Sequence, residues 1–153
     1  IFFPTFNQMK KLLLLVLLIL IGCSSPEPIN IETMLIERND VYYTKDTNQP
    51  YSGPVFSLNE NGQLQEELVL KDGELDGTYK SYYENGQLES EGTNKNGQRD
   101  GPYKSYYQNG QLFQEVTFKD GQVDGLWKYY NDNGQLQEER TYKDSELIDS
   151  KEY

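Results

Sequence analysis

The sequence predicts an all-β protein, an antiparallel β-meander of tandem 24-residue β-hairpin repeats in an elongated, curved, largely single-layer sheet. The tetrapeptide Asn-Gly-Gln-Leu occurs four times at a constant spacing of 24 residues. Two further glycine series keep the same spacing, one running from Gly53 to Gly125 and the other from Gly73 to Gly121. A fixed period in this range is typical of repeat proteins, in which each repeat is one supersecondary unit.

The Asn-Gly pairs predict the hairpin turns. A two-residue type I′ turn needs positive φ at both central residues, which Asn and Gly tolerate best. The predicted turns are Asn61-Gly62, Asn85-Gly86, Asn109-Gly110 and Asn133-Gly134. Asp72-Gly73, Asn96-Gly97 and Asp120-Gly121 predict a second set of two-residue turns. The segments between the turns are rich in Tyr, Thr and Leu, which favour strands, and none has helical periodicity.

The turn positions predict the strand register. With Asn85-Gly86 as the turn, Lys80 pairs with Glu91 across the hairpin. The next two units pair Lys104 with Glu115 and Lys128 with Glu139 in the same way. Opposite charges directly across a ladder contribute about 0.2–1 kcal/mol each. Three such pairs support this register.

Strict alternation along the strands predicts two different faces. One face is expected to collect seven apolar or aromatic residues, Leu64, Leu88, Leu112, Leu136, Tyr79, Tyr103 and Trp127. The other is expected to collect Glu, Lys and Thr with one tyrosine row, Tyr82, Tyr106 and Tyr130. Bulges at Gly77, Gly101 and Gly125 would disturb this alternation. The last unit differs from the others, because Ser145 replaces its turn glycine.

The first part of the chain predicts the cellular location of the protein. Met9 is followed by two lysines and an apolar run from residue 12 to residue 21, which is too short to span a bilayer and fits a signal peptide. The run ends in Leu-Ile-Gly-Cys23, which resembles the bacterial lipobox. This resemblance implies cleavage before Cys23 and lipid attachment to it. Cys23 is the only cysteine, so the chain can form no internal disulfide.

These features divide the chain into four parts. Residues 1–8 are expected to lie upstream of the true start, and residues 9–22 to form the lipoprotein signal peptide. Residues 23–38 are expected to form the lipidated Cys and a tether, and residues 39–153 the repeat domain. The predicted location is the bacterial cell envelope. Because Ser24 rather than Asp follows the cysteine, the outer membrane is favoured over the inner one if two membranes exist.

Charge and composition exclude several classes of function. The net charge is −11, and it becomes −13 when residues 1–22 are removed with Lys10 and Lys11. An acidic chain lacks the basic clusters that neutralise nucleic-acid phosphates, and it would contact a membrane through its lipid anchor only. The chain has no histidine and no nucleotide-binding or hydrolase motif. We therefore expect neither an enzyme nor a cofactor.

The repeated carboxylates and tyrosines admit two interpretations each. Asp-Gly-x-x-Asp-Gly segments such as residues 72–77 could bind calcium, but they lack the ligand series of an EF-hand loop, so no metal site is predicted. The tyrosine rows could serve as cross-strand packing or as binding anchors. The candidate binding face is the row Tyr82, Tyr106 and Tyr130.

The repeat core resembles the bacterial variant of the membrane occupation and recognition nexus (MORN) repeat. The resemblance rests on YYENGQLESEGTNKNGQRDGPY at 82–103 and YYQNGQLFQEVTFKDGQVDGLW at 106–127, and residues 37–64 resemble the usual first unit of such proteins. Proteins of this kind are commonly identified as YwqK-type antitoxins. The resemblance implies hairpin repeats and a non-catalytic, protein-binding role, without functional residues that could be carried over.

The expected function is therefore a membrane-anchored repeat scaffold that binds a protein partner. One alternative is an antitoxin or immunity protein of a toxin–antitoxin system, as the resemblance implies. Another is binding of cell-wall or host glycan through the aromatic rows, because Tyr and Trp stack on sugars.

Overall fold

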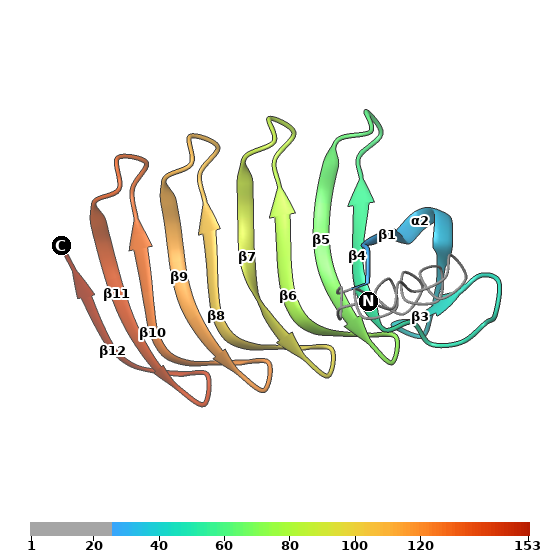
Figure 1. Cartoon of the computed structure of the whole chain (residues 1–153). Helices are drawn as coiled ribbons and strands as arrows, with labels where there is room; N and C mark the ends of the chain where they lie inside the picture. Colours follow the sequence, from blue (N-terminus) through green and yellow to red (C-terminus); the bar gives the residue numbers. More distant parts are fainter. Residues whose placement is uncertain (1–25) are drawn as a thin grey trace, which may run out of the picture.

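The computed structural model describes residues 26–153 as one long ten-stranded sheet with a small two-stranded sheet beside its N-terminal end (Figure 1). From β4 onward each strand pairs with the next along the chain, and all of these pairs are antiparallel. The nine successive strands are β4 (Gly53–Leu58), β5 (Leu64–Lys71), β6 (Glu74–Tyr82), β7 (Leu88–Lys95), β8 (Gln98–Tyr106), β9 (Leu112–Lys119), β10 (Gln122–Tyr130), β11 (Leu136–Lys143) and β12 (Glu146–Glu152). The predicted meander of hairpins in a single curved layer is confirmed.

A small cap covers the first hairpin. It consists of β1 (Ile29–Asn30), α2 (Ile31–Met34), β2 (Leu35–Arg38) and β3 (Val41–Thr44). Strand β1 adds to the sheet in parallel with β4, and the side chain of Asn30 caps α2 by accepting a 3.0 Å hydrogen bond from the Thr33 amide. Residues 29–38, which were expected to belong to the tether, form β1, α2 and β2.

The cap and the first strands enclose the main hydrophobic cluster. Leu35 from the cap is buried against Val55, Leu68 and Leu70 of the sheet. Ile29 and Tyr79 are among the partly buried side chains around them. Only one further apolar side chain among residues 26–153, Val116, is equally buried. Most of the sheet therefore has no second layer over it.

The two sets of hairpin turns lie at opposite ends of the strands and differ in geometry (Figure 1). The Asp-Gly set forms the expected two-residue turns, with φ of 52° at Asp72 and 86° at Gly73. The Asn-Gly set does not, because Gly86 has a φ of 80° while Asn85 is not in the positive-φ region. Residues 83–87 instead form a longer loop, in which the Gly86 amide donates to the Tyr83 carbonyl at 2.8 Å. Gly62, Gly110 and Gly134 make the same bond to Asn59, Tyr107 and Asn131.

The longer loop brings a one-residue bulge, which corrects the predicted position of the leucine row. Glu89 is the extra residue, because Ser81 pairs with Ser90 while Tyr82 pairs with Leu88. Residues directly opposite each other on antiparallel strands point to the same face. The leucines therefore share the face of the Tyr82 row, whereas they were expected beside Tyr79. The equivalent pairs are Leu58–Leu64, Tyr106–Leu112 and Tyr130–Leu136.

A second irregularity lies at Gly77, Gly101 and Gly125, yet it preserves the alternation. Leu70 pairs with Leu75, and Leu68 pairs with Tyr79. Three residues of β6, 76–78, therefore lie opposite the single residue Val69 of β5, which is two more than regular pairing would place there. Two extra residues, unlike one, return the side chains to their original faces. Gly77 takes a φ of 131°, and a Cβ there would lie 2.9 Å from Cβ of Val69. The glycine series is thus explained by a bulge that other residues fit poorly.

Hydrogen bonds at both ends of the strands connect each repeat to the next. At the two-residue turns, the Gly97 amide donates to the Leu75 carbonyl at 2.8 Å. At the opposite end of the strands, the Tyr83 hydroxyl donates to the Tyr106 carbonyl at 2.6 Å, and the Asn85 side-chain amide donates to the Gln108 carbonyl at 3.1 Å. Contacts between neighbouring units add to the intrinsic stability of each unit in repeat proteins.

Candidate functional site

One face of the sheet, here called the ladder face, carries a continuous row of alternating charges. Each lysine of the inner strands lies directly across from a glutamate on both neighbouring strands, and Lys151 on the edge strand β12 lies across from one. The row is Glu67, Lys80, Glu91, Lys104, Glu115, Lys128, Glu139 and Lys151. Lys128 Nζ lies 3.7 Å from a carboxylate oxygen of Glu115 and 3.7 Å from one of Glu139. The predicted register of the lysine–glutamate pairs is confirmed, and the row continues beyond the three pairs expected.

The candidate binding tyrosines lie beside this row, and their hydroxyl groups are bonded to it. Tyr82, Tyr106 and Tyr130 are all half-buried. Tyr106 donates a 2.8 Å hydrogen bond to Glu91, and Tyr130 a 2.9 Å hydrogen bond to Glu115. Tyr82 bonds to Glu67 in the same way. At the end of the sheet, the hydroxyl of Tyr153 bonds to Glu139.

Burial and these bonds together disfavour ionisation of the three phenols. Burial, followed by the hydrogen bond to a carboxylate and the charge of that carboxylate, raises the pKa of Tyr82, Tyr106 and Tyr130 to about 12. Each phenol therefore helps to hold a glutamate in the charge row. Their role as binding anchors stays a prediction, now for rings whose polar ends already have partners.

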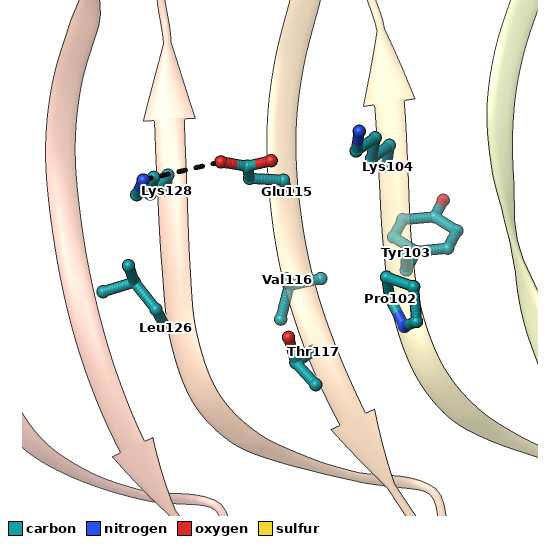
Figure 2. A pocket seen from close by; sticks show the side chains of 8 residues that line it. All are labelled: Pro102, Tyr103, Lys104, Glu115, Val116, Thr117, Leu126 and Lys128. Atoms are coloured by element: carbon teal, nitrogen blue, oxygen red, sulfur yellow. Dashed lines mark ion pairs between the residues drawn. The ribbon is translucent and has the colours of Figure 1, made fainter.

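Shallow hollows lie along the ladder face, one in each of several repeats. Figure 2 shows one of them, in which Lys128, Glu115 and Lys104 form one line across the strands and Leu126, Thr117 and Pro102 form a parallel line below it. Its volume is about 210 Å³. Because similar hollows recur beside Thr78 and beside Pro54, they reflect the repeat rather than one specialised site.

The opposite face, here called the aromatic face, carries a connected group of rings over β8 to β11. The group consists of Tyr107, Phe113, Tyr129, Trp127 and Tyr142. Trp127 stacks on Tyr129 with ring centroids 5.2 Å apart, and Phe113 meets Tyr107 edge-on at 5.1 Å. Phe113 is 37% exposed. It occupies the bulge position equivalent to Glu89, and the bulge is what turns it onto this face.

Two of the three arginines of the chain lie over rings of the aromatic face. The guanidinium of Arg99 is 4.2 Å from the ring centre of Tyr103, and that of Arg140 is 5.1 Å from the ring centre of Tyr129. Arg140 also donates hydrogen bonds of 2.6 and 2.8 Å to Glu138. This face therefore combines large rings with positively charged groups.

The Asp-Gly-x-x-Asp-Gly segments act as connectors between turns. Asp76 accepts a 3.3 Å hydrogen bond from the Asn96 amide, and Asp100 accepts one of the same length from the Asp120 amide. Within residues 26–153, no three metal-ligating side chains gather around a common point. In the same part of the chain, no helix is long and apolar enough to cross a membrane. Cys23, the predicted lipidation site, lies outside the described residues.

Comparison with known families identifies the repeats. Residues 75–96, 99–120 and 123–144 each match the model of the MORN repeat variant. The three matches coincide with the three hairpins β6–β7, β8–β9 and β10–β11. The expected likeness to this repeat is thereby confirmed for these segments.

The chain was also compared as a whole with curated proteins and with solved structures. No curated protein matches the chain. Among solved structures, a crystal structure described as the GtfA/B complex bound to UDP and GlcNAc aligns with 82% of this chain at 12% identity and a TM-score of 0.34. The alignment covers 26% of that protein's chain. Nothing about function follows from so distant a likeness.

Proposed function

We propose that the protein is a non-catalytic repeat scaffold that binds a protein partner on its aromatic face over β8 to β11. The MORN repeat variants support a binding role, because such repeats often serve as binding modules. The connected group of Tyr107, Phe113, Trp127, Tyr129 and Tyr142, accompanied by Arg140, is the observation that carries the choice of face.

The two faces differ in the way that interfaces differ from ordinary surface. Tyr, Trp, Phe and Arg are enriched in protein interfaces, whereas Lys, Glu and Ser are depleted. The ladder face is built mainly from Lys, Glu and Thr, and its charges already neutralise one another. The aromatic face also has a covered part, because the cap packs over Leu68 and Leu70 near its N-terminal end. A partner over β8 to β11 would continue the layer that the cap begins.

Two equally exposed apolar side chains on opposite faces provide the test. Phe113 is 37% exposed on the aromatic face, and Leu126 is 41% exposed on the ladder face. We expect Phe113→Ser to abolish crosslinking to the partner in intact cells, and Leu126→Ser to leave it unchanged. Loss in the Leu126 variant alone would move the interface to the ladder face, where the Tyr82, Tyr106 and Tyr130 row is the candidate. Equal loss in both would contradict a face-specific interface.

The identity of the crosslinked partner separates the narrower functions. A toxin encoded next to this protein would support the antitoxin alternative. The exposed rings on the aromatic face also favour glycan binding as a second candidate, because aromatic faces stack on sugars. Retention on a cell-wall polysaccharide column, lost in Phe113→Ser and kept in Leu126→Ser, would support that candidate.

The proposal includes a lipid anchor at Cys23, supported by the lipobox-like residues before it. Cys23→Ser should move the protein from the membrane fraction to the soluble fraction and abolish labelling with a fatty acid. A membrane-bound Cys23→Ser protein would remove the anchor from the proposal without affecting the interface.

A further inference from the structure

Strand β7 departs from the repeat in the size of its side chains. On the aromatic face it carries Ser90, Gly92 and Asn94. The equivalent residues of β9, 24 positions later, are Gln114, Val116 and Phe118. Those of β11 are Glu138, Arg140 and Tyr142. The ring of Tyr103 covers Gly92, and a depression lies over Glu89 and Ser90, here called the β7 furrow.

The floor of the furrow is polar and its walls are aromatic. Ser81, Ser90 and Ser105 lie next to one another across three strands and form the floor. Tyr79, Tyr83, Tyr103 and Phe113 contribute to the walls of a hollow of about 380 Å³. This volume lies within the range of about 300–1,000 Å³ that is usual for ligand pockets.

One hydroxyl at the floor has an unfilled hydrogen-bonding capacity. Ser81 and Ser90 share a hydrogen bond of 2.8 Å. The Oγ of Ser105, by contrast, is buried and has no hydrogen-bond partner within the described part of the chain. A buried hydroxyl without a partner is costly. A polar ligand group in the furrow would remove this cost.

The furrow also contains a carboxylate without a cation. Glu89 is turned onto the aromatic face by the bulge, and its Oε2 accepts a 3.2 Å hydrogen bond from Ser81. No lysine or arginine of residues 26–153 forms an ion pair with it. The equivalent residues of the other units are Gln65, Phe113 and Gln137, so this charge is specific to the furrow.

The last repeat shows how the aromatic face holds an arginine between a ring and a carboxylate. Arg140 stands 48 residues after Gly92, at the equivalent position two repeats later. Its guanidinium lies over the ring of Tyr129 and donates two hydrogen bonds to Glu138. In the β7 furrow the ring of Tyr103 lies over Gly92, and the residues equivalent to Tyr129 and Glu138 are Ser81 and Ser90. The furrow has rings and a carboxylate from other positions of the unit, namely Tyr79, Tyr83, Tyr103 and Glu89.

We infer that the β7 furrow receives an arginine side chain of the protein partner. The guanidinium would lie between the tyrosine walls, pair with Glu89 and donate to Ser105 Oγ. Its five donors and its flat shape match this combination of carboxylate, hydroxyls and rings. The acidic character of the chain, with a net charge of −11, also favours a basic partner segment. This inference rests on the proposed protein-binding function of the aromatic face.

The test is an NMR titration of the full ¹⁵N-labelled chain in nonionic detergent micelles with N-acetyl-arginine methylamide. N-acetyl-citrulline methylamide, which has nearly the same shape and no charge, is the control ligand. We expect the arginine compound to shift the amide signals of Ser81, Ser90, Gly92 and Ser105. Citrulline should bind at least about tenfold more weakly, because a hydrogen-bonded charge pair is lost.

Two isosteric variants separate a specific pair from general acidity. Glu89→Gln should weaken arginine binding at least about tenfold. Glu84→Gln removes the same charge from the exposed loop of the same hairpin and should leave binding unchanged. Three results would each overturn the inference: equal weakening by both variants, shifts of signals outside the furrow, or equal binding of the citrulline compound. Equal binding of citrulline is what a site for neutral ligands such as sugars would give. If Phe113→Ser still abolishes crosslinking, the proposed function survives that result.

Discussion

The hydroxyl of Tyr106 donates a 2.8 Å hydrogen bond to Oε1 of Glu91, which lies 15 residues earlier on a neighbouring strand. The same bond, at the same separation, joins Tyr130 to Glu115. Each of these glutamates also lies between two lysines of the ladder row. The tyrosine row is therefore part of the scaffold of the ladder face, whatever else it binds.

Removing one of these hydroxyls should destabilise the fold. We expect Tyr106→Phe to lower the free energy of unfolding by about 1 kcal/mol, because the ring stays in place while Glu91 loses a donor. Tyr43→Phe is the matched control, since the Tyr43 hydroxyl has no hydrogen bond within residues 26–153. Urea denaturation of both variants provides the measurement. A cost no larger than that of Tyr43→Phe would show that the bond contributes nothing to stability.

Alkaline pH should weaken the same bonds. The pKa of Tyr82, Tyr106 and Tyr130 is raised to about 12 in the folded protein, against about 10 in an unfolded chain. A raised pKa favours the neutral phenol in the folded state, so its contribution is complete below pH 10 and is lost as the pH rises from about 10 to 12. Urea midpoints across this range should fall steeply for the wild type. The triple Tyr→Phe variant should fall less, and an identical decrease would contradict the assignment.

The turn chemistry and period were sufficient to predict the fold, because each repeat contains its own register signal. Lys80 opposite Glu91 was predictable from the position of the Asn-Gly pair, and it is observed. The bulge at Glu89 was not, because a two-residue turn and a longer loop with one extra residue give the same register further along the strands. That single residue decides the face of the leucines and of Phe113.

The candidate site was less predictable than the fold, for a related reason. The tyrosine-to-glutamate bonds span repeats, but their constant separation of 15 residues was a readable signal. The β7 furrow had a signal as well, namely the departure of Ser90 and Gly92 from the bulkier residues of other units. The role of the cap was hidden, because Leu35 belongs to a segment without repeat periodicity.

The longer hairpin loop requires a left-handed backbone conformation at Gly86. Its φ is 80°, and a Cβ at this position would have no atom within 4 Å. Gly86→Ala therefore meets no clash and costs only left-handed backbone strain, which the greater freedom of glycine in the unfolded chain partly offsets. We expect it to lower the free energy of unfolding by about 0.5–1 kcal/mol. Glu84→Ala in the same loop should change it by less than about 0.5 kcal/mol. The measurement is the melting temperature of the two variants in thermal unfolding. Equal melting temperatures would be incompatible with the observed loop geometry.

The final turn contains a strained residue that the other repeats avoid. Asp144 and Ser145 have φ of 49° and 67°, the same geometry as Asp120 and Gly121 one repeat earlier, at 48° and 79°. The Ser145 amide keeps the inter-repeat hydrogen bond, donating to the Val123 carbonyl at 3.0 Å. The turn therefore forms with a serine at the left-handed position that is Gly73, Gly97 or Gly121 in the earlier repeats.

Ser145→Gly should consequently stabilise the protein. Left-handed geometry costs a residue with a side chain about 1–2 kcal/mol, and the greater freedom of glycine in the unfolded chain offsets about 0.5–1 kcal/mol of that. We expect a net gain of about 0.5–1 kcal/mol in the free energy of unfolding. The reverse change, Gly121→Ser, should cost a similar amount, because a Cβ there would be 3.6 Å from the nearest atom and would meet no clash. Opposite shifts of the urea midpoint in these two variants are the required result. If Ser145→Gly leaves the midpoint unchanged while Gly121→Ser lowers it, the last hairpin does not unfold together with the rest of the sheet.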